Sequence, residues 1–280
     1  MTHHDPTSPP TDLLWLRRLF TAFALLGLYL AVRAFRSPDQ WPAGPHFDML
    51  YTLVLLPLVG GACVAAYRGH FRTFILLALA DRAISAFGAL LYFLRMALPS
   101  SMFHSSKHPD YLAWNLLGAS LSAALLVYLS RKYPPDVQAL STRARVPGAL
   151  RLLQGGFLLG AAAITIDIAP DLGRHVTEES PHGHSCHWFF AQALVMALLA
   201  SAFVAGMRRK WATFVSLGFV GSTLTAFYNI THLIMDSFQD EMLGTAYDPV
   251  YLSRNLPVFA FALFSVVYLA RRFPPRLPSA

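Results

Sequence analysis

The residues best suited to chemistry in this chain are histidines with acidic or thiol neighbours, set in an otherwise apolar sequence. His232 and Asp236 are four positions apart, so on a helix they lie one turn apart on the same face. A carboxylate in that position can fix the tautomer of the imidazole and raise its basicity. The pair is therefore the first candidate for acid–base chemistry. Hydrogen bonding between packed helices is the alternative explanation.

The face of the helix that carries His232 also carries Ser222, Thr225 and Asn229, at spacings of three and four. Polar groups inside an apolar span usually face the bundle interior or a water-filled cavity. Packing between helices explains Ser222 and Thr225 most simply. We expect Asn229 to contribute to ligand binding.

A charged residue, Arg82, lies about ten residues into the apolar segment 72–96, where an isolated charge costs at least about 2.5 kcal/mol. Arg82 therefore needs a partner. Asp81 is adjacent and projects in another direction from a helix, so we expect the two to have different partners. Arg82 is either part of a structural ion pair or an anion-binding or proton-relay residue, and it joins His232 and Asp236 as a candidate catalytic residue.

Further candidates for ligand binding lie toward the same end of the spans as His232. Tyr111 with Asn115, and Tyr251 with Asn255, form a duplicated pair of motifs. The tyrosines fit ordinary anchoring at the membrane interface, whereas the asparagines lie one turn deeper. Arg254 is a candidate partner for Asp236 or Asp240. The candidate ligand-binding residues are Asn229, Tyr92, Asn115, Asn255 and Arg254.

The segment around 175–187 is the densest group of potential metal ligands. Imidazole and thiolate groups bind zinc, copper or iron, and mixed Cys/His tracts are metal candidates. A solvated loop is the alternative, since no paired spacing such as CxxC or HExxH occurs. The candidate ligands of a divalent metal are His175, His182, His184, Cys186 and His187.

The elements that position these residues are apolar. The sequence is 55% hydrophobic and 13% charged, with a mean hydropathy of +0.45, whereas a soluble domain carries about 25% charged residues. A bilayer-spanning helix needs about 20 apolar residues, and these segments are long enough. We predict an all-α polytopic membrane protein in a lipid bilayer. The net charge of +7 does not indicate nucleic-acid binding, because the basic residues lie at the ends of the predicted helices.

The sequence repeats itself after 140 positions. Residues 127–135 (VYLSRKYPP) return as 267–275 (VYLARRFPP), and further matches join 65–74 to 205–214. A period this long indicates a duplicated domain rather than a solenoid, whose periods are about 20–50 residues. We predict a tail at 1–13, a first repeat at 14–133, a linker at 134–149, a second repeat at 150–273 and a tail at 274–280. The predicted spans are 14–33, 48–67, 72–96, 111–130, 150–168, 188–207, 211–235 and 251–270.

Charge predicts the orientation of these eight spans. Lys and Arg concentrate at the N-terminal flank, in the turns after spans 2 and 6, in the linker and in the C-terminal tail. Because excess Lys and Arg mark the cytoplasmic side, we expect both termini to be cytoplasmic. Four spans in each half give the halves the same orientation, as in parallel-repeat carriers. Short loops and the lack of a cleavable signal at Met1–Asp12 favour a bacterial inner membrane.

The start of each half resembles the first helix of DoxX-like four-helix membrane proteins. The resemblance rests on residues 16–20 (LRRLF) leading to Gly27, on 150–156 (LRLLQGG) leading to Gly160, and on 231–236 (THLIMD). It implies two fused DoxX-like units over most of 14–272. The family includes subunits linked to quinone and thiol redox chemistry, and no catalytic residue carries over from it.

Three functions are compatible with these features. The first is binding or transformation of a lipid-soluble molecule, of quinone or isoprenoid type, in an outward-facing cavity between spans 3, 4, 7 and 8. The second is a carrier or metal-handling protein that uses the His-rich segment. The third is a non-catalytic membrane subunit or scaffold whose polar groups only pack. The sequence leaves open whether the chain is an enzyme, and it leaves the oligomeric state open.

Overall fold

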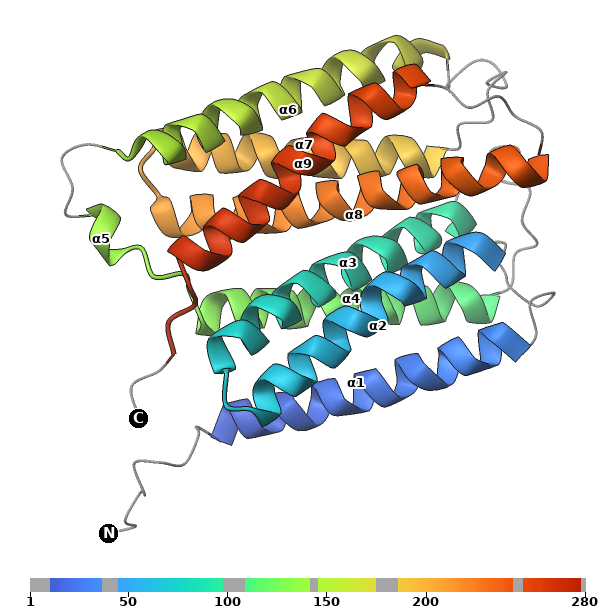
Figure 1. Cartoon of the computed structure of the whole chain (residues 1–280), viewed down its shortest axis with the longest axis horizontal. Helices are drawn as coiled ribbons and strands as arrows, with labels where there is room; N and C mark the ends of the chain where they lie inside the picture. The colour runs from blue at the N-terminus through green and yellow to red at the C-terminus, as the bar shows by residue number, and fades with distance from the viewer. Residues whose placement is uncertain are drawn as a thin grey trace.

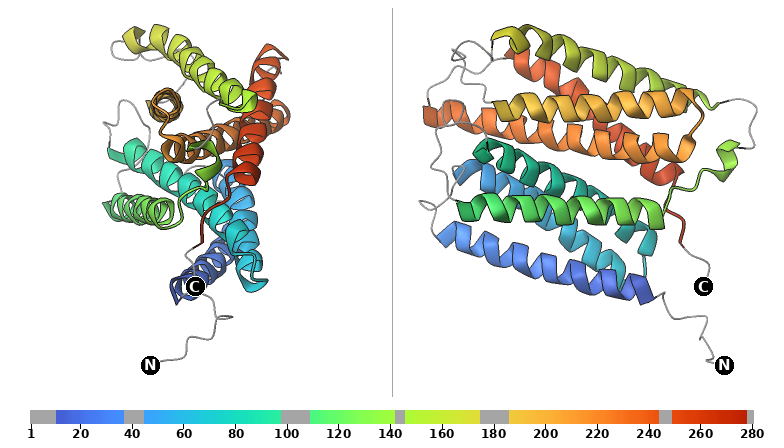
Figure 2. Two further views of the ribbon diagram at one scale, coloured as in Figure 1. Left: turned by 90° about the vertical axis from the view of Figure 1, so that its left-hand side faces the viewer. Right: turned by 180° about the vertical axis from the view of Figure 1, so that it is seen from behind.

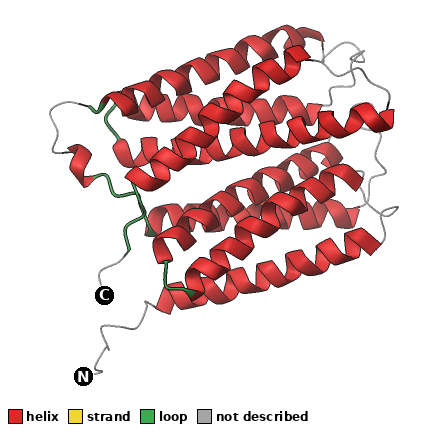
Figure 3. Cartoon of the chain, in the orientation of Figure 1, coloured by secondary structure: helices red, strands yellow, loops and turns green. Residues whose placement is uncertain are grey.

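Eight long helices contain the eight predicted spans, one in each. The computed structural model describes residues 11–36, 45–97, 109–141, 146–174, 186–243 and 249–277, and side chains near several helix ends lie outside this description. No strand occurs within the described residues (Figure 3). The prediction of an all-α chain is confirmed. The long helices are α1 (Thr11–Arg36), α2 (Pro45–Tyr67), α3 (Phe71–Ala97), α4 (Pro109–Lys132), α6 (Gly148–Arg174), α7 (Cys186–Met207), α8 (Trp211–Leu243) and α9 (Pro249–Arg272).

The linker contains a short element that the sequence did not predict, the four-residue helix α5 (Gln138–Ser141). Asp136 stands two residues before Gln138, and its Oδ1 accepts a hydrogen bond from the Gln138 N–H at 3.3 Å. This contact between an aspartate and the N–H two residues later is an Asx turn, and it caps the first N–H of the helix.

The long helices form two groups, the first group (α1–α4) and the second group (α6–α9), which lie side by side (Figures 1 and 2). Within each group, helices adjacent in sequence pack against one another. Between the groups, α3 packs on α7 and α8, and α2 packs on α8. The inner helices α2, α3, α7 and α8 therefore join the groups. Figure 1 shows the α2–α3 and α7–α8 turns, the end of α4 and the end of α9 together at its left side, which we call the basic end.

The surface of the bundle is apolar. Six helices are long and apolar enough to cross a membrane, among them α1, α4, α6 and α9. In the most apolar windows of α1, α4 and α9, only 17% of residues are buried, against 56% in α3. Large side chains such as Trp114, Leu159 and Ile166 are more than 70% exposed. Soluble proteins rarely expose contiguous apolar surface on this scale, so the structure indicates a multi-pass membrane protein.

The turns after α2 and α7 have the same conformation at positions 140 apart. Each helix ends in a Schellman motif, in which a residue with positive φ follows the helix. Gly69 takes this position with φ 76° and Arg209 with φ 55°. The same backbone geometry is therefore built once with glycine and once with a residue that tolerates it poorly. The bonds are His70 N to Ala65 O (2.8 Å) and Gly69 N to Ala66 O (3.2 Å), then Lys210 N to Ala205 O (2.9 Å) and Arg209 N to Gly206 O (3.0 Å).

This difference between the turns gives a prediction with opposite signs. A left-handed conformation costs a non-glycine residue roughly 1–2 kcal/mol, so we expect Arg209→Gly to raise the melting temperature and Gly69→Ala to lower it. Thermal unfolding of the purified protein in detergent measures both. If both variants shifted the melting temperature in the same direction, the positive φ at positions 69 and 209 would not be the cause of the shifts.

The aromatic core also recurs in the two groups. Phe20 of α1 packs edge-to-face on Phe74 of α3, with ring centroids 5.4 Å apart. Phe157 of α6 packs on Phe214 of α8 at 5.7 Å. All four rings are fully buried. In both groups an aromatic residue of the first helix thus anchors that helix to the third.

Candidate functional site

The charged centre of the first group is a pair of consecutive residues on α3, Asp81 and Arg82. They are 1% and 8% exposed. The Arg82 Nε donates to Asp81 Oδ2 at 2.8 Å, and Arg82 Nη2 contacts the same oxygen. One carboxylate oxygen therefore accepts both donors on one edge of the guanidinium. The expectation that the two residues have different partners is wrong, because the Arg82 side chain is long enough to reach its neighbour.

Residues of α1 and α4 complete the surroundings of Arg82. Its Nη1 lies 3.4 Å from the Ser122 Oγ on α4. Its guanidinium carbon lies 4.3 Å from the ring centre of Phe23 and 5.4 Å from that of Phe20, both on α1. These are cation–π distances, at which an aromatic face stabilises a desolvated cation. Arg82 thus ties three helices of the first group together. No periodicity in the sequence indicated Ser122, Phe20 or Phe23 as its neighbours.

The second group has no counterpart of this ion pair. The positions 140 residues after Asp81, Arg82 and Ser122 are Gly221, Ser222 and Ala262. Phe157, which corresponds to Phe20 in the aromatic core, packs edge-to-face on Phe261, with ring centroids 6.3 Å apart. At these equivalent positions the described side chains of the two groups therefore differ in chemistry: the first group has a buried ion pair, and the second has uncharged, closely packed side chains.

The polar stripe predicted on span 7 is buried on α8. Ser222, Thr225 and Asn229 are 2%, 9% and 6% exposed. Thr225 Oγ1 donates to the Gly221 carbonyl, and Asn229 Nδ2 donates to the Thr225 carbonyl, each at 2.8 Å. These bonds stay within α8, whereas the sequence had suggested hydrogen bonds between helices. The polar face lies inside the bundle, as the cost of exposing it to lipid requires.

A second side of α8 is buried too, because α8 lies among α2, α3, α7 and α9. Thr223 is 7% exposed, and its Oγ1 has no hydrogen-bond partner among the described residues. Buried hydroxyls in proteins almost always have a partner, whether protein or water. α8 is therefore polar on more than one face. Its described part is not among the six helices that are long and apolar enough to cross a membrane.

Most of the other predicted site residues lie outside the described side chains. His232 and Asp236 belong to α8, Tyr92 to α3 and Arg254 to α9. The structure describes the helical backbone at these positions but not the side chains. Asn115 and Asn255 are described, and each interacts with a neighbouring group. All five predicted metal ligands, His175, His182, His184, Cys186 and His187, also lie outside the described side chains. Within the described residues, no three His, Cys, Asp or Glu side chains are grouped to hold a metal ion.

Among the described side chains, the contacts of Arg82 do not include the polar face of α8. The neighbours of Arg82 come from α1, α3 and α4, all in the first group. Asn229 and the other stripe residues belong to the second group. The two sets of polar groups therefore occupy separate interiors. The outward-facing cavity expected between spans 3, 4, 7 and 8 stays a prediction.

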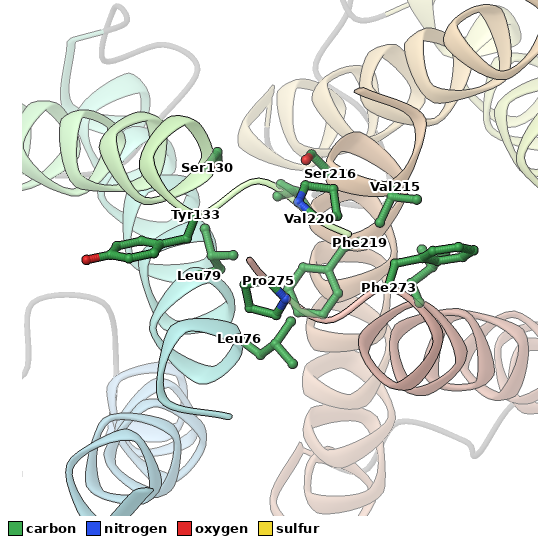
Figure 4. A pocket seen from close by; sticks show the side chains of 12 residues that line it. Leu76, Leu79, Ser130, Tyr133, Val215, Ser216, Phe219, Val220, Phe273 and Pro275 are labelled. Atoms are coloured by element: carbon green, nitrogen blue, oxygen red, sulfur yellow. The ribbon is translucent and has the colours of Figure 1, made fainter. Parts of the chain in front are cut away.

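The pocket found among the described residues lies at the basic end instead, between α3 and α8 (Figure 4). Its volume is about 30 Å³, room for about one water molecule. Its lining is mainly apolar, and Figure 4 shows the Tyr133 hydroxyl pointing away from it. Burial raises the pKa of Tyr133 to about 12, so this phenol stays neutral at physiological pH. The pocket has neither the size nor the groups for a quinone-sized ligand.

Comparison with family models, with curated proteins and with solved structures finds no match for this chain.

Proposed function

We propose that this chain is an eight-span membrane protein made of two DoxX-like four-helix units that face the same way, with both termini in the cytoplasm of a bacterial cell. In this proposal it binds a lipid-soluble molecule of quinone or isoprenoid type in an outward-facing cavity. The repeated Schellman turns and the repeated aromatic pairs support the duplication. The pattern of contacts between the groups supports it too, because α3–α7 and α2–α8 are equivalent pairs under the repeat.

One observation carries the binding proposal: the polar face of α8 is buried as far as Asn229. His232 and Asp236 follow Asn229 by three and seven positions, so they belong to the same row of the helix as Asn229, and our proposal takes this row to stay buried up to them. An imidazole and a carboxylate buried in a membrane bundle are costly and usually functional. His232 binds the carbonyl or hydroxyl of the ligand, and Asp236 orients the imidazole. Because Asp81 already neutralises Arg82, we assign Arg82 a structural role in the first unit.

Binding of a short-chain prenylated benzoquinone tests this proposal. The full-length protein in lipid nanodiscs is titrated by calorimetry, as wild type, as His232→Ala and as His70→Ala. His70 is the matched control, since it lies exposed in the α2–α3 turn. A lost hydrogen bond that leaves a buried partner unsatisfied costs about 1–3 kcal/mol, so His232→Ala should raise Kd by about fivefold or more. An unchanged Kd in His232→Ala would contradict the proposal.

The second candidate function is a non-catalytic membrane subunit whose polar groups only pack. The observation that favours it is that Thr225 and Asn229 bond to their own helix and that Arg82 is neutralised by its neighbour. This role predicts that neither benzoquinone nor farnesol binds to the wild-type protein in the same titration. Saturable binding of either ligand would exclude it.

A further inference from the structure

The two copies of the repeated Pro-Pro segment pair with each other at the basic end. Pro135 and Pro275 face one another in an isolated antiparallel bridge. Asp136 N donates to Pro274 O and Arg276 N donates to Pro134 O, each at 2.9 Å. We call residues 134–136 and 274–276 the clasp. It joins the chain after α4 to the chain after α9, and thus the first group to the second.

The clasp is symmetric in its backbone. Asp136 and Arg276, the two donors, are equivalent positions of the repeat, and so are Pro274 and Pro134, the two acceptors. Exchanging the two copies of the repeat therefore turns one hydrogen bond into the other. This arrangement is a non-hydrogen-bonded antiparallel pair, in which the two facing residues donate nothing to each other. Proline lacks an N–H, and the donors here are Asp136 and Arg276. The two prolines are therefore compatible with this pairing. Because equivalent residues face each other, the pairing lies on a local two-fold axis that relates the two groups.

The side chains break this symmetry at one equivalent position. Residue 136 is acidic and residue 276, its counterpart, is basic. Arg276 Nε and Nη2 donate to Asp136 Oδ1 at 3.1 and 3.0 Å. This contact lowers the pKa of the Asp136 carboxyl, with Arg276 as the largest cause. The carboxylate is thus ionised at physiological pH, and the two charges face each other across the axis.

Opposite charges at positions 136 and 276 favour pairing of a first group with a second group over pairing of two like groups. A first group paired with a second group brings Asp136 against Arg276. Two first groups from different chains would bring aspartate against aspartate, and two second groups would bring arginine against arginine. Like charges in direct contact are unfavourable, and such repulsion is a common device of pairing specificity.

We propose that Asp136 and Arg276 make the clasp a pairing-specificity device: it selects the second group as the partner of the first and disfavours pairing of like groups from two chains. The side chains are 46% and 39% exposed, so the selectivity is modest. An exposed ion pair is worth up to about fivefold in an equilibrium constant, and its reversal adds a repulsion of similar size.

A disulfide across the clasp tests this proposal in the full-length chain. Pro135→Cys and Pro275→Cys are introduced together with Cys63→Ala and Cys186→Ser, and the disulfide is equilibrated with glutathione. Facing residues of a non-hydrogen-bonded pair have Cα atoms about 4.5 Å apart, within the range that a disulfide spans. We expect a disulfide within one chain. Failure to form it would overturn the clasp itself.

Charge reversal then tests whether the charges at positions 136 and 276 stabilise the clasp beyond its backbone hydrogen bonds. We expect Asp136→Arg or Arg276→Asp to lower the equilibrium constant for the disulfide about fivefold or more, and the double reversal to restore it within about twofold. Arg271→Asp, exposed near the clasp but outside it, is the control and should leave it unchanged. A double reversal no better than the single variants would overturn the proposal.

Co-expression tests the choice of partner. One tagged chain carries Pro135→Cys with Asp136→Arg, and the other carries Pro275→Cys with Arg276→Asp, both without the native cysteines. Each chain is then repulsive within itself and complementary to the other. The disulfide between chains should increase about fivefold over the same pair with native charges. No increase would overturn the proposal.

Discussion

Replacing Asp81 with alanine should lower the free energy of unfolding by about 3–5 kcal/mol, because it leaves Arg82 charged and buried without its counter-ion. Arg82 is 8% exposed, and two of its donor nitrogens contact Asp81 Oδ2. Ser122 and the rings of Phe20 and Phe23 remain, but none of them carries a negative charge. A denaturing-detergent titration of the folded protein measures the loss.

The double substitution Asp81→Leu with Arg82→Met is the informative companion. Replacement of a whole buried ion pair by apolar residues of similar size is often neutral or even stabilising. We therefore expect the double variant to be much closer to wild type than Asp81→Ala is. Arg68→Met, at an exposed position beyond α2, should change stability by no more than about 0.5 kcal/mol. If Asp81→Ala costs as little as Arg68→Met, then Asp81 does not neutralise Arg82 in the membrane.

The second large effect is expected at Gly156, where α6 and α9 meet closely. A Cβ atom at position 156 would overlap with the ring of Phe261. The ring also packs on Phe157, so it has to move against a buried neighbour. Overpacking of this kind costs typically about 1–3 kcal/mol. We expect Gly156→Ala to destabilise the protein by that amount in the same titration.

The adjacent residue provides the control for this prediction. Gly155 is exposed, and a Cβ there would meet no atom within 4 Å. Because alanine is the better helix former by about 1 kcal/mol, Gly155→Ala should be neutral or stabilising. Adding Phe261→Leu to Gly156→Ala should recover part of the loss by removing the clashing ring. Equal losses in the two alanine variants would show that Phe261 does not pack on Gly156.

The helices were predictable from sequence because their signal is local. Each needs only a long apolar stretch, and the bilayer's thickness sets its length. The inward direction of the α8 polar face was predictable for the same reason, since Ser222, Thr225 and Asn229 recur with the helical period. The four-residue helix α5 was not, because it depends on a cap from Asp136 and lies in a segment without apolar periodicity.

Contacts between distant segments were predicted poorly. The position of Arg82 in its span showed that it needs a partner, but the choice of Asp81 depends on a side-chain path that helical geometry does not specify. The clasp joins residues 140 positions apart. The repeated Pro-Pro motif showed that the two segments of the clasp are equivalent, yet equivalence alone does not show that two segments are in contact. The separate interiors of Arg82 and Asn229 followed only from the packing of the helices.

A topology map of the protein in intact cells measures whether the two groups face the same way. A reporter is fused after Ala280, and single cysteines placed in 98–108, 142–145 and 244–248 are labelled with a charged thiol reagent on intact cells. We expect a cytoplasmic reporter, protection at 142–145, and labelling at both 98–108 and 244–248. A reporter outside the cell, or labelling at only one of 98–108 and 244–248, would contradict two units that face the same way.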